Sequence, residues 1–104
     1  MLYRQLIYFI PFKQTMKKVI IEKFNEFEIS NRGISSWPIW EKEVSEFDWY
    51  YDTQEQCLFL EGEVVIKTEE EDFKIKKGDF VIFNKGLQCT WKVIKPVKKH
   101  YKFS

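Results

Sequence analysis

Short strand-like runs, each closed by a turn signal, occupy the chain from residue 47 almost to its end; most alternate apolar with polar residues, and residues 80–83 are wholly apolar, as in a strand buried on both sides. The runs are Phe47–Tyr51, Gln56–Thr68, Phe73–Ile75, Phe80–Phe83, Gln88–Ile94 and Val97–Phe103. Turn-forming residues separate them, as in Lys77-Gly-Asp79, Asn84-Lys-Gly86 and Lys95-Pro96. Short strands at this spacing are typical of a sandwich or barrel and not of βαβ units. We therefore predict an all-β barrel with Gly62 bending its longest strand.

The period of two assigns side chains to faces of these strands. Three sets are predicted to share a face each: Phe47, Trp49 and Tyr51; Cys89, Trp91 and Val93; and Leu58, Leu60, Val64 and Ile66. The opposite face of the long strand carries Glu55, Cys57, Phe59 and Glu61 until Gly62 disturbs the count. A rolled sheet needs apolar residues on both faces, one filling the lumen and one meeting another layer.

The first half of the chain predicts one strand and one short helix. Lys18–Phe24 is rich in β-branched residues, and Asn25 is suited to cap a helical turn that runs to Arg32 and ends at Gly33. Pro38 favours an extended residue before it and a one-turn helix after it. Residues 1–15 are predicted to be an extension, with Met16 as an alternative start; an extra edge strand over residues 3–10 is the other interpretation.

Composition excludes several classes of partner. The chain of 104 residues suits one domain, residues 16–104, and its 17 basic residues nearly balance 16 acidic ones. The basic stretch 92–102 alternates with apolar residues, as a solvated strand face does. A helix that spans a membrane needs about 20 consecutive apolar residues, and no run in this sequence is nearly that long. We predict a cytoplasmic protein with reduced cysteines that binds neither nucleic acid nor membrane.

Several spaced motifs resemble the cupin superfamily. Glu55 and Gly62 match the end of its first motif, and residues 78–86 match the second except that Asn84 replaces Pro. The fuller series is similar to short single-barrel cupins of the ureidoglycine aminohydrolase and ethanolamine-utilisation group. It covers residues 35–103 and reads Trp37-Pro-x-Trp40, Phe47-x-Trp49, Leu60-Glu-Gly-Glu63, Gly78-Asp79, Lys85-Gly86, Cys89-x-Trp91 and Lys99-His-Tyr101. The resemblance implies a jelly-roll barrel that pairs as a homodimer.

The metal-binding pattern of cupins is largely missing from this chain. The resemblance places the first two His positions on Trp49 and Tyr51, or on Asp48 and Tyr50, and the third on Cys89. Only Glu55 is retained, and indole and phenol are poor substitutes for imidazole. We therefore predict no cofactor and no tightly held metal, with Glu55, Cys89 and His100 as the weak candidates for an altered metal set.

The candidate site residues each have a structural alternative. Trp49, Tyr51, Glu55, Cys89 and Trp91 are predicted to line a ligand pocket, although the aromatic rings suit core filling and Glu55 suits a solvated turn almost equally well. Glu55, Cys89 and His100 are the candidate catalytic groups, as acid or base, nucleophile and proton carrier. The alternative for Cys89, as for Cys57, is a buried structural thiol. The alternative for His100 is a place on an exposed strand face.

Three more charged residues are predicted to lie outside the site, two at the surface and one in a turn. Lys85 and Lys99 are predicted to be surface residues, with pairing to an anionic ligand as the alternative. Asp79 is predicted to hold its turn through bonds to the backbone.

Three functions remain open from the sequence. The first is a cupin that binds a small molecule in an aromatic pocket, with or without metal-independent catalysis. The second is a metal-dependent aminohydrolase-like enzyme. The third is a non-catalytic dimeric module that senses a metabolite and pairs through the edge strand 18–24.

Overall fold

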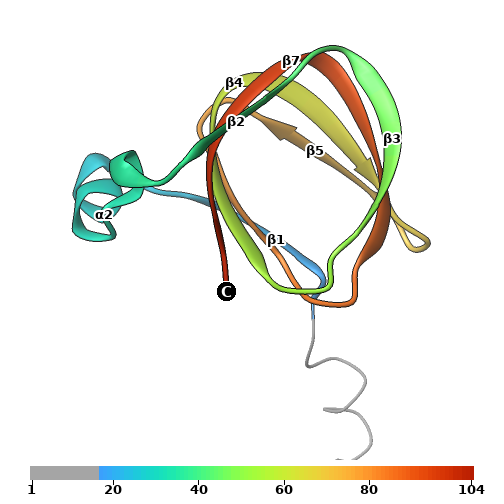
Figure 1. Cartoon of the computed structure of the whole chain (residues 1–104), viewed down its shortest axis with the longest axis horizontal. Coiled ribbons are helices and arrows are strands. Elements are labelled where there is room, and N and C mark those ends of the chain that lie inside the picture. The colour runs from blue at the N-terminus through green and yellow to red at the C-terminus, as the bar shows by residue number, and fades with distance from the viewer. Residues whose placement is uncertain (1–16) are drawn as a thin grey trace, which may run out of the picture.

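Strands dominate the computed structural model, which describes residues 17–104 (Figure 1). One antiparallel sheet contains all seven strands of this part of the chain, in the order β1-β6-β4-β7-β2, with β3 also paired to β7 and β5 to β4. Their bounds are β1 (Val19–Lys23), β2 (Ile39–Lys42), β3 (Ser45–Tyr50), β4 (Glu55–Lys67), β5 (Asp72–Lys76), β6 (Asp79–Phe83) and β7 (Gln88–Phe103). The sheet curls around a common interior, so the prediction of an all-β barrel is confirmed.

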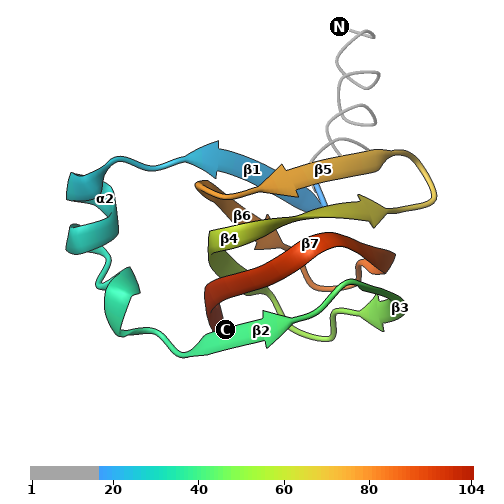
Figure 2. The ribbon, with the colours of Figure 1, turned by 90° about the horizontal axis from the view of Figure 1, so that it is seen from above.

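The short helix α2 (Glu26–Asn31) follows the prediction closely. Asn25 Oδ1 accepts a hydrogen bond from the Glu28 amide at 2.9 Å, and the Glu28 side chain accepts one from the Asn25 amide, which completes a capping box. Gly33 ends the segment with φ +67°, a conformation that favours glycine. Figure 2 shows α2 beyond one end of the strands, outside the barrel.

The one-turn helix predicted after Pro38 is wrong. A 3-10 helix (Ile34–Ser36) lies before Pro38, and β2 begins directly after it at Ile39. The carbonyl of Pro38 accepts a hydrogen bond from the Tyr101 amide at 3.0 Å, so this segment pairs with β7 at once. Pairing with a neighbouring strand satisfies the backbone there, and this long-range partner is invisible in the local sequence.

The outer face of the barrel carries a small apolar cluster beneath α2. Its buried members are Ile34, Leu58 and Phe80. The ring of Phe24 stacks on Phe80 at 4.2 Å, and the Arg32 guanidinium lies 4.6 Å from the Phe24 centroid. These contacts anchor α2 and the 3-10 helix to the outside of β4 and β6.

Gly62 inverts the faces of β4. The glycine has φ +99°, and the pairing of β4 with β7 shifts register three times between Phe59 and Val64. Before this bulge the odd-numbered residues Cys57 and Phe59 face the interior, and after it the even-numbered Val64 and Ile66 do. Leu58 packs in the outer cluster instead. The prediction that Leu58 and Leu60 share a face with Val64 and Ile66 is therefore wrong.

Strand β7 is continuous through Pro96, whereas the sequence predicted two strands separated there. Its 16 residues pair with β2, β3 and β4. Pro96 lies opposite the Gly62 bulge, where the regular ladder is already interrupted, so its missing N–H costs little. This long strand therefore joins three other strands and supplies much of the barrel wall.

Three remaining sequence predictions concern turns, termini and membranes. The Asp79 carboxylate accepts a hydrogen bond from the Lys76 amide at 2.9 Å and pairs with Lys23, which confirms its role at the turn. The extension over residues 1–15, the edge strand over 3–10 and the start at Met16 lie outside the described residues. Among residues 17–104 the structure contains no helix long and apolar enough to span a bilayer.

Candidate functional site

A pocket of about 300 Å³ opens into the barrel interior. Seven aromatic side chains and one acid–base pair line it: Trp40, Phe47, Trp49, Tyr51, Trp91, Tyr101 and Phe103, with Glu55 and Lys99. They come from strands β2, β3, β4 and β7, and Tyr51 directly follows β3. The rolled sheet therefore assembles them from distant parts of the chain. Trp49, Tyr51, Glu55 and Trp91, four of the five predicted pocket residues, lie here.

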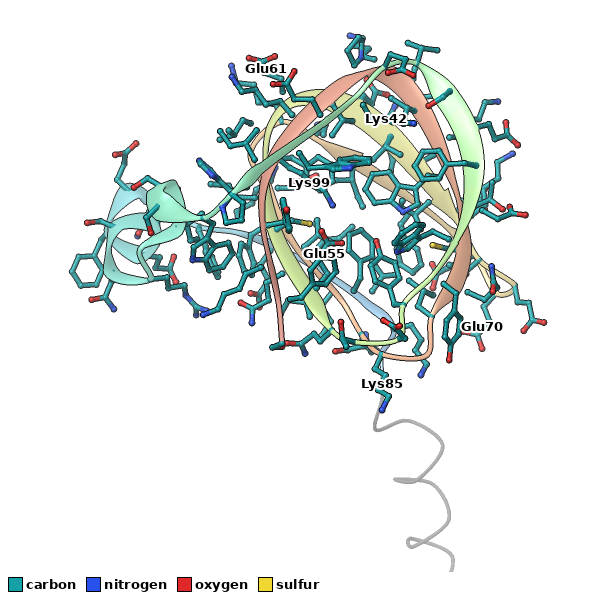
Figure 3. The ribbon with its side chains drawn as sticks, viewed as in Figure 1. Lys42, Glu55, Glu61, Glu70, Lys85 and Lys99 are labelled. Atoms are coloured by element: carbon teal, nitrogen blue, oxygen red, sulfur yellow. The ribbon has the colours of Figure 1, made fainter. Side chains whose placement is uncertain are left out.

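Glu55 and Lys99 form a buried ion pair inside the barrel. The Lys99 Nζ donates to Glu55 Oε2 at 2.6 Å, and each residue is 3% exposed. Figure 3 shows the two side chains within the ring of strands, with Lys85 at its outer margin. The surface role predicted for Lys99 is therefore wrong, whereas Lys85 is exposed as predicted. The solvated-turn interpretation of Glu55 is also wrong.

Aromatic faces surround the Lys99 ammonium. Its Nζ lies 4.8 Å from the Trp91 ring centroid and 4.9 Å from that of Trp40, and Phe59 and Phe83 are each 5.9 Å away. A cation held over desolvated aromatic faces gains about 2 kcal/mol or more. These contacts and the Glu55 carboxylate therefore stabilise a charged ammonium in a place where burial alone would oppose it.

Two buried polar groups lie next to this pair. Trp91 Nε1 is buried without a hydrogen-bond partner among residues 17–104. It neighbours the Tyr51 hydroxyl without reaching hydrogen-bond geometry. Burial, and then the charge of Glu55, raise the pKa of Tyr51 well above its usual range, so the phenol stays protonated. Tyr51 thus offers the pocket a hydroxyl that can donate or accept.

The pocket is graded from a buried floor to an exposed mouth. Tyr51, Glu55, Trp91 and Lys99 are nearly inaccessible, while Trp49 is 47% exposed and Phe103 is 51% exposed. The Phe47 ring lies parallel to Trp91 with centroids 5.9 Å apart. A ligand would therefore meet flat apolar surfaces first and polar groups at the bottom.

Cys89 lies on the predicted face but not at the pocket surface. Its side chain is buried in the interior cluster, and burial raises its pKa to about 11. Burial raises the pKa of Cys57 as well, and its thiol contacts the Val81 carbonyl at 3.7 Å. Because the thiolate is the nucleophilic form, both cysteines are poorly suited to catalysis at neutral pH. The structural interpretation of these thiols fits their surroundings.

His100 lies on the outside of the barrel. Its Nδ1 is 2.9 Å from the Trp37 carbonyl oxygen, and the ring does not line the pocket. The structure therefore does not bring His100 together with Glu55 and Cys89. Within residues 17–104 no three His, Cys, Asp or Glu side chains converge as a metal set, so the donors present do not fit the metal of a metal-binding cupin.

Sequence reasoning missed the second half of the ion pair and part of the aromatic wall. Lys99 alternates with Tyr101 and Phe103, so period two already placed it on an apolar face. Trp40, which the sequence placed in a motif of the resemblance but not among the pocket candidates, contributes to the pocket because β2 pairs with β7 through Trp40 and Lys99. No local signal predicts that pairing.

Comparisons with known proteins agree with this architecture. A family model described as the EutQ-like cupin domain matches residues 29–101. A solved DUF861 family protein from Thermotoga maritima is 54% identical, with a TM-score of 0.80, and the match covers 83% of this chain and 99% of that one. No curated protein matches the chain.

Two more distant structures share the fold. An ethanolamine utilisation protein Q from Salmonella typhimurium is 22% identical, and the match covers 82% of this chain and 68% of that one. The EutQ protein of Clostridium difficile is 17% identical, with 82% and 66% covered. Both have a TM-score of 0.59. At these identities the likeness concerns the fold alone.

Proposed function

This chain belongs to the family of EutQ-like cupin domains, and from that premise we propose that it binds a small molecule in the aromatic pocket of its barrel. The observation that carries the proposal is the Glu55–Lys99 pair at the floor of that pocket. A buried ion pair is a weak means of stabilising a fold, because well-packed apolar residues of similar volume do as well or better. Placed at the floor of a pocket, the pair supplies directional groups for a ligand.

The exposed mouth also supports a binding role. Trp49 and Phe103 keep about half of their surface open to solvent although both adjoin an apolar interior. Large aromatic rings at the edge of a concave, mostly apolar site are typical of ligand-binding surfaces. From residues 17–104 the pocket receives neither an ionised thiol nor an imidazole, so binding accounts for its groups better than nucleophilic or metal-assisted catalysis.

Tryptophan fluorescence offers a direct test, because Trp40, Trp49 and Trp91 line the pocket whereas Trp37 packs in the outer cluster. We expect small planar compounds to quench the fluorescence and to raise the melting temperature of the protein. Failure of a broad panel of such compounds to produce either effect would count against the proposal.

A matched pair of variants locates the binding. Trp49 lines the pocket, while its neighbour Tyr50 is similarly exposed but does not line it. Trp49→Ala should weaken binding about two- to tenfold through lost stacking, and Tyr50→Ala should leave the affinity unchanged. Equal effects of the two variants would place the compound elsewhere on the surface.

The homodimer and the cytoplasmic location predicted from the sequence stay predictions. A closer relation to ureidoglycine aminohydrolases stays a prediction as well. For the metal-dependent form of that alternative, residues 17–104 offer no convergent set of three metal ligands.

A further inference from the structure

Among residues 17–104, one acid, one base and otherwise only aromatic side chains line the pocket, and this composition limits the ligands that the pocket can accept. Resting on the binding role proposed above, we propose that the ligand is a flat, uncharged ring carrying an N–H beside a C=O, as in a lactam or cyclic imide. Its polar edge binds across the Glu55–Lys99 pair, and its ring lies against the aromatic wall.

The charge of the pocket excludes strongly charged ligands. Glu55 and Lys99 neutralise each other at 2.6 Å, and within the described part of the chain no other ionised side chain lines the pocket. A ligand with a net charge would lose its hydration among aromatic rings without gaining an unpaired counter-charge. The aromatic faces that would attract a ligand cation already hold the Lys99 ammonium. An uncharged ligand avoids both costs.

The remaining hydrogen-bonding capacity of the pair matches an N–H and C=O edge. The ion pair uses Glu55 Oε2, and Oε1 makes no hydrogen bond within residues 17–104. Lys99 Nζ donates a single hydrogen bond there, to that carboxylate, although an ammonium has three N–H donors. A lactam edge donates its N–H to the carboxylate and accepts from the ammonium, so both groups gain a partner while the ion pair stays closed.

The size and walls of the pocket favour a flat ring. Its volume of about 300 Å³ is at the lower end of ligand sites, which suits a single ring or a small fused system. Seven aromatic residues supply the wall, and the two most exposed of them, Trp49 and Phe103, lie at the mouth. A ring can therefore stack near Trp49 while its polar edge reaches the floor.

Binding of four matched probes to the wild-type protein tests the proposal: uracil, its N,N-dimethyl derivative, benzoate and benzylammonium. All are small and contain one planar six-membered ring, and they differ in N–H donors and in charge. We expect uracil to bind about tenfold or more tightly than each of the other three, because only uracil pairs with both charged groups without an added charge. Calorimetry and tryptophan quenching, with Trp49→Ala as the site control, measure the ranking.

A double variant tests whether the ion pair causes that ranking. Glu55→Leu/Lys99→Met removes both charges at similar volume, so the barrel should remain folded. In this variant the preference for uracil over dimethyluracil should disappear. Persistence of the preference, or tighter binding of benzoate or benzylammonium to the wild type, overturns the proposed ligand class but leaves the binding role intact. If none of the four probes binds, the proposed ligand class fails, whereas the binding role fails only if the broad panel of planar compounds also produces neither quenching nor a higher melting temperature.

Discussion

Replacement of Gly62 by alanine isolates the contact that sets the interior face of β4. A Cβ at this position would lie 2.3 Å from the Pro96 carbonyl oxygen, 2.7 Å from Val97 Cα and 2.8 Å from the Pro96 carbonyl carbon. All three are backbone atoms of β7, so no side-chain rotation relieves the overlap. The two central strands of the barrel would have to separate at the bulge.

Gly78 provides a matched control for the backbone conformation. Its φ of +95° is close to the +99° of Gly62, but a Cβ there meets only the Lys23 Nζ, at 3.9 Å. Both alanine variants carry the cost of an unfavourable φ, about 1–3 kcal/mol. Gly62→Ala adds an overpacking cost of about 1–3 kcal/mol, for a total of about 2–6 kcal/mol. Gly78→Ala should lose only the about 1–3 kcal/mol that the unfavourable φ costs.

Urea unfolding of the two variants measures the difference directly. Each 1 kcal/mol should also lower the melting temperature by about 4–8 °C in a domain of this size. Gly62→Ala should therefore melt distinctly below Gly78→Ala. If the two variants lose the same free energy of unfolding, the close approach of β4 and β7 at Pro96 is not a constraint and the reasoning from the bulge is refuted.

Three further predictions concern the ion pair, a buried thiol and the helix cap. Glu55→Leu and Lys99→Met alone should each destabilise the protein by about 3–5 kcal/mol, because each leaves one buried charge unpaired, whereas the double variant should be close to wild type. Urea unfolding of all four proteins measures this coupling, and additive losses would contradict it. Because the pKa of Cys89 rises from 9.0 to about 11 on folding, its thiol contributes stability below pH 9 that is lost as the pH rises toward 11. Unfolding free energies measured across that window should fall less steeply in Cys89→Ala than in the wild type, and identical slopes would argue against the shift. Asn25→Ala should cost about 0.5–2 kcal/mol by removing the capping box of α2; thermal melts measure the loss, and an unchanged melting temperature would mean that the cap does not contribute to global stability.

The sequence by itself determined the elements whose causes are local. Alternation and turn residues located most of the strands within one or two residues, and the Asn25 cap with Gly33 bounded the helix. The cupin resemblance is likewise carried by short motifs at fixed spacing. In these cases neighbouring residues supply the backbone hydrogen bonds and the turn geometry, so adjacent positions in the chain contain the necessary information.

Only the tertiary structure decided which faces became the interior and how the site was completed. The close passage of Pro96 over Gly62 inverted the face of β4 and kept β7 continuous. Pairing of β2 with β7 brought Trp40 beside Lys99, and rolling of the sheet brought that lysine to Glu55. A lysine in a basic stretch such as residues 92–102 suggests a solvated charge, and the burial of Lys99 becomes favourable only when a carboxylate and aromatic faces from distant strands surround it.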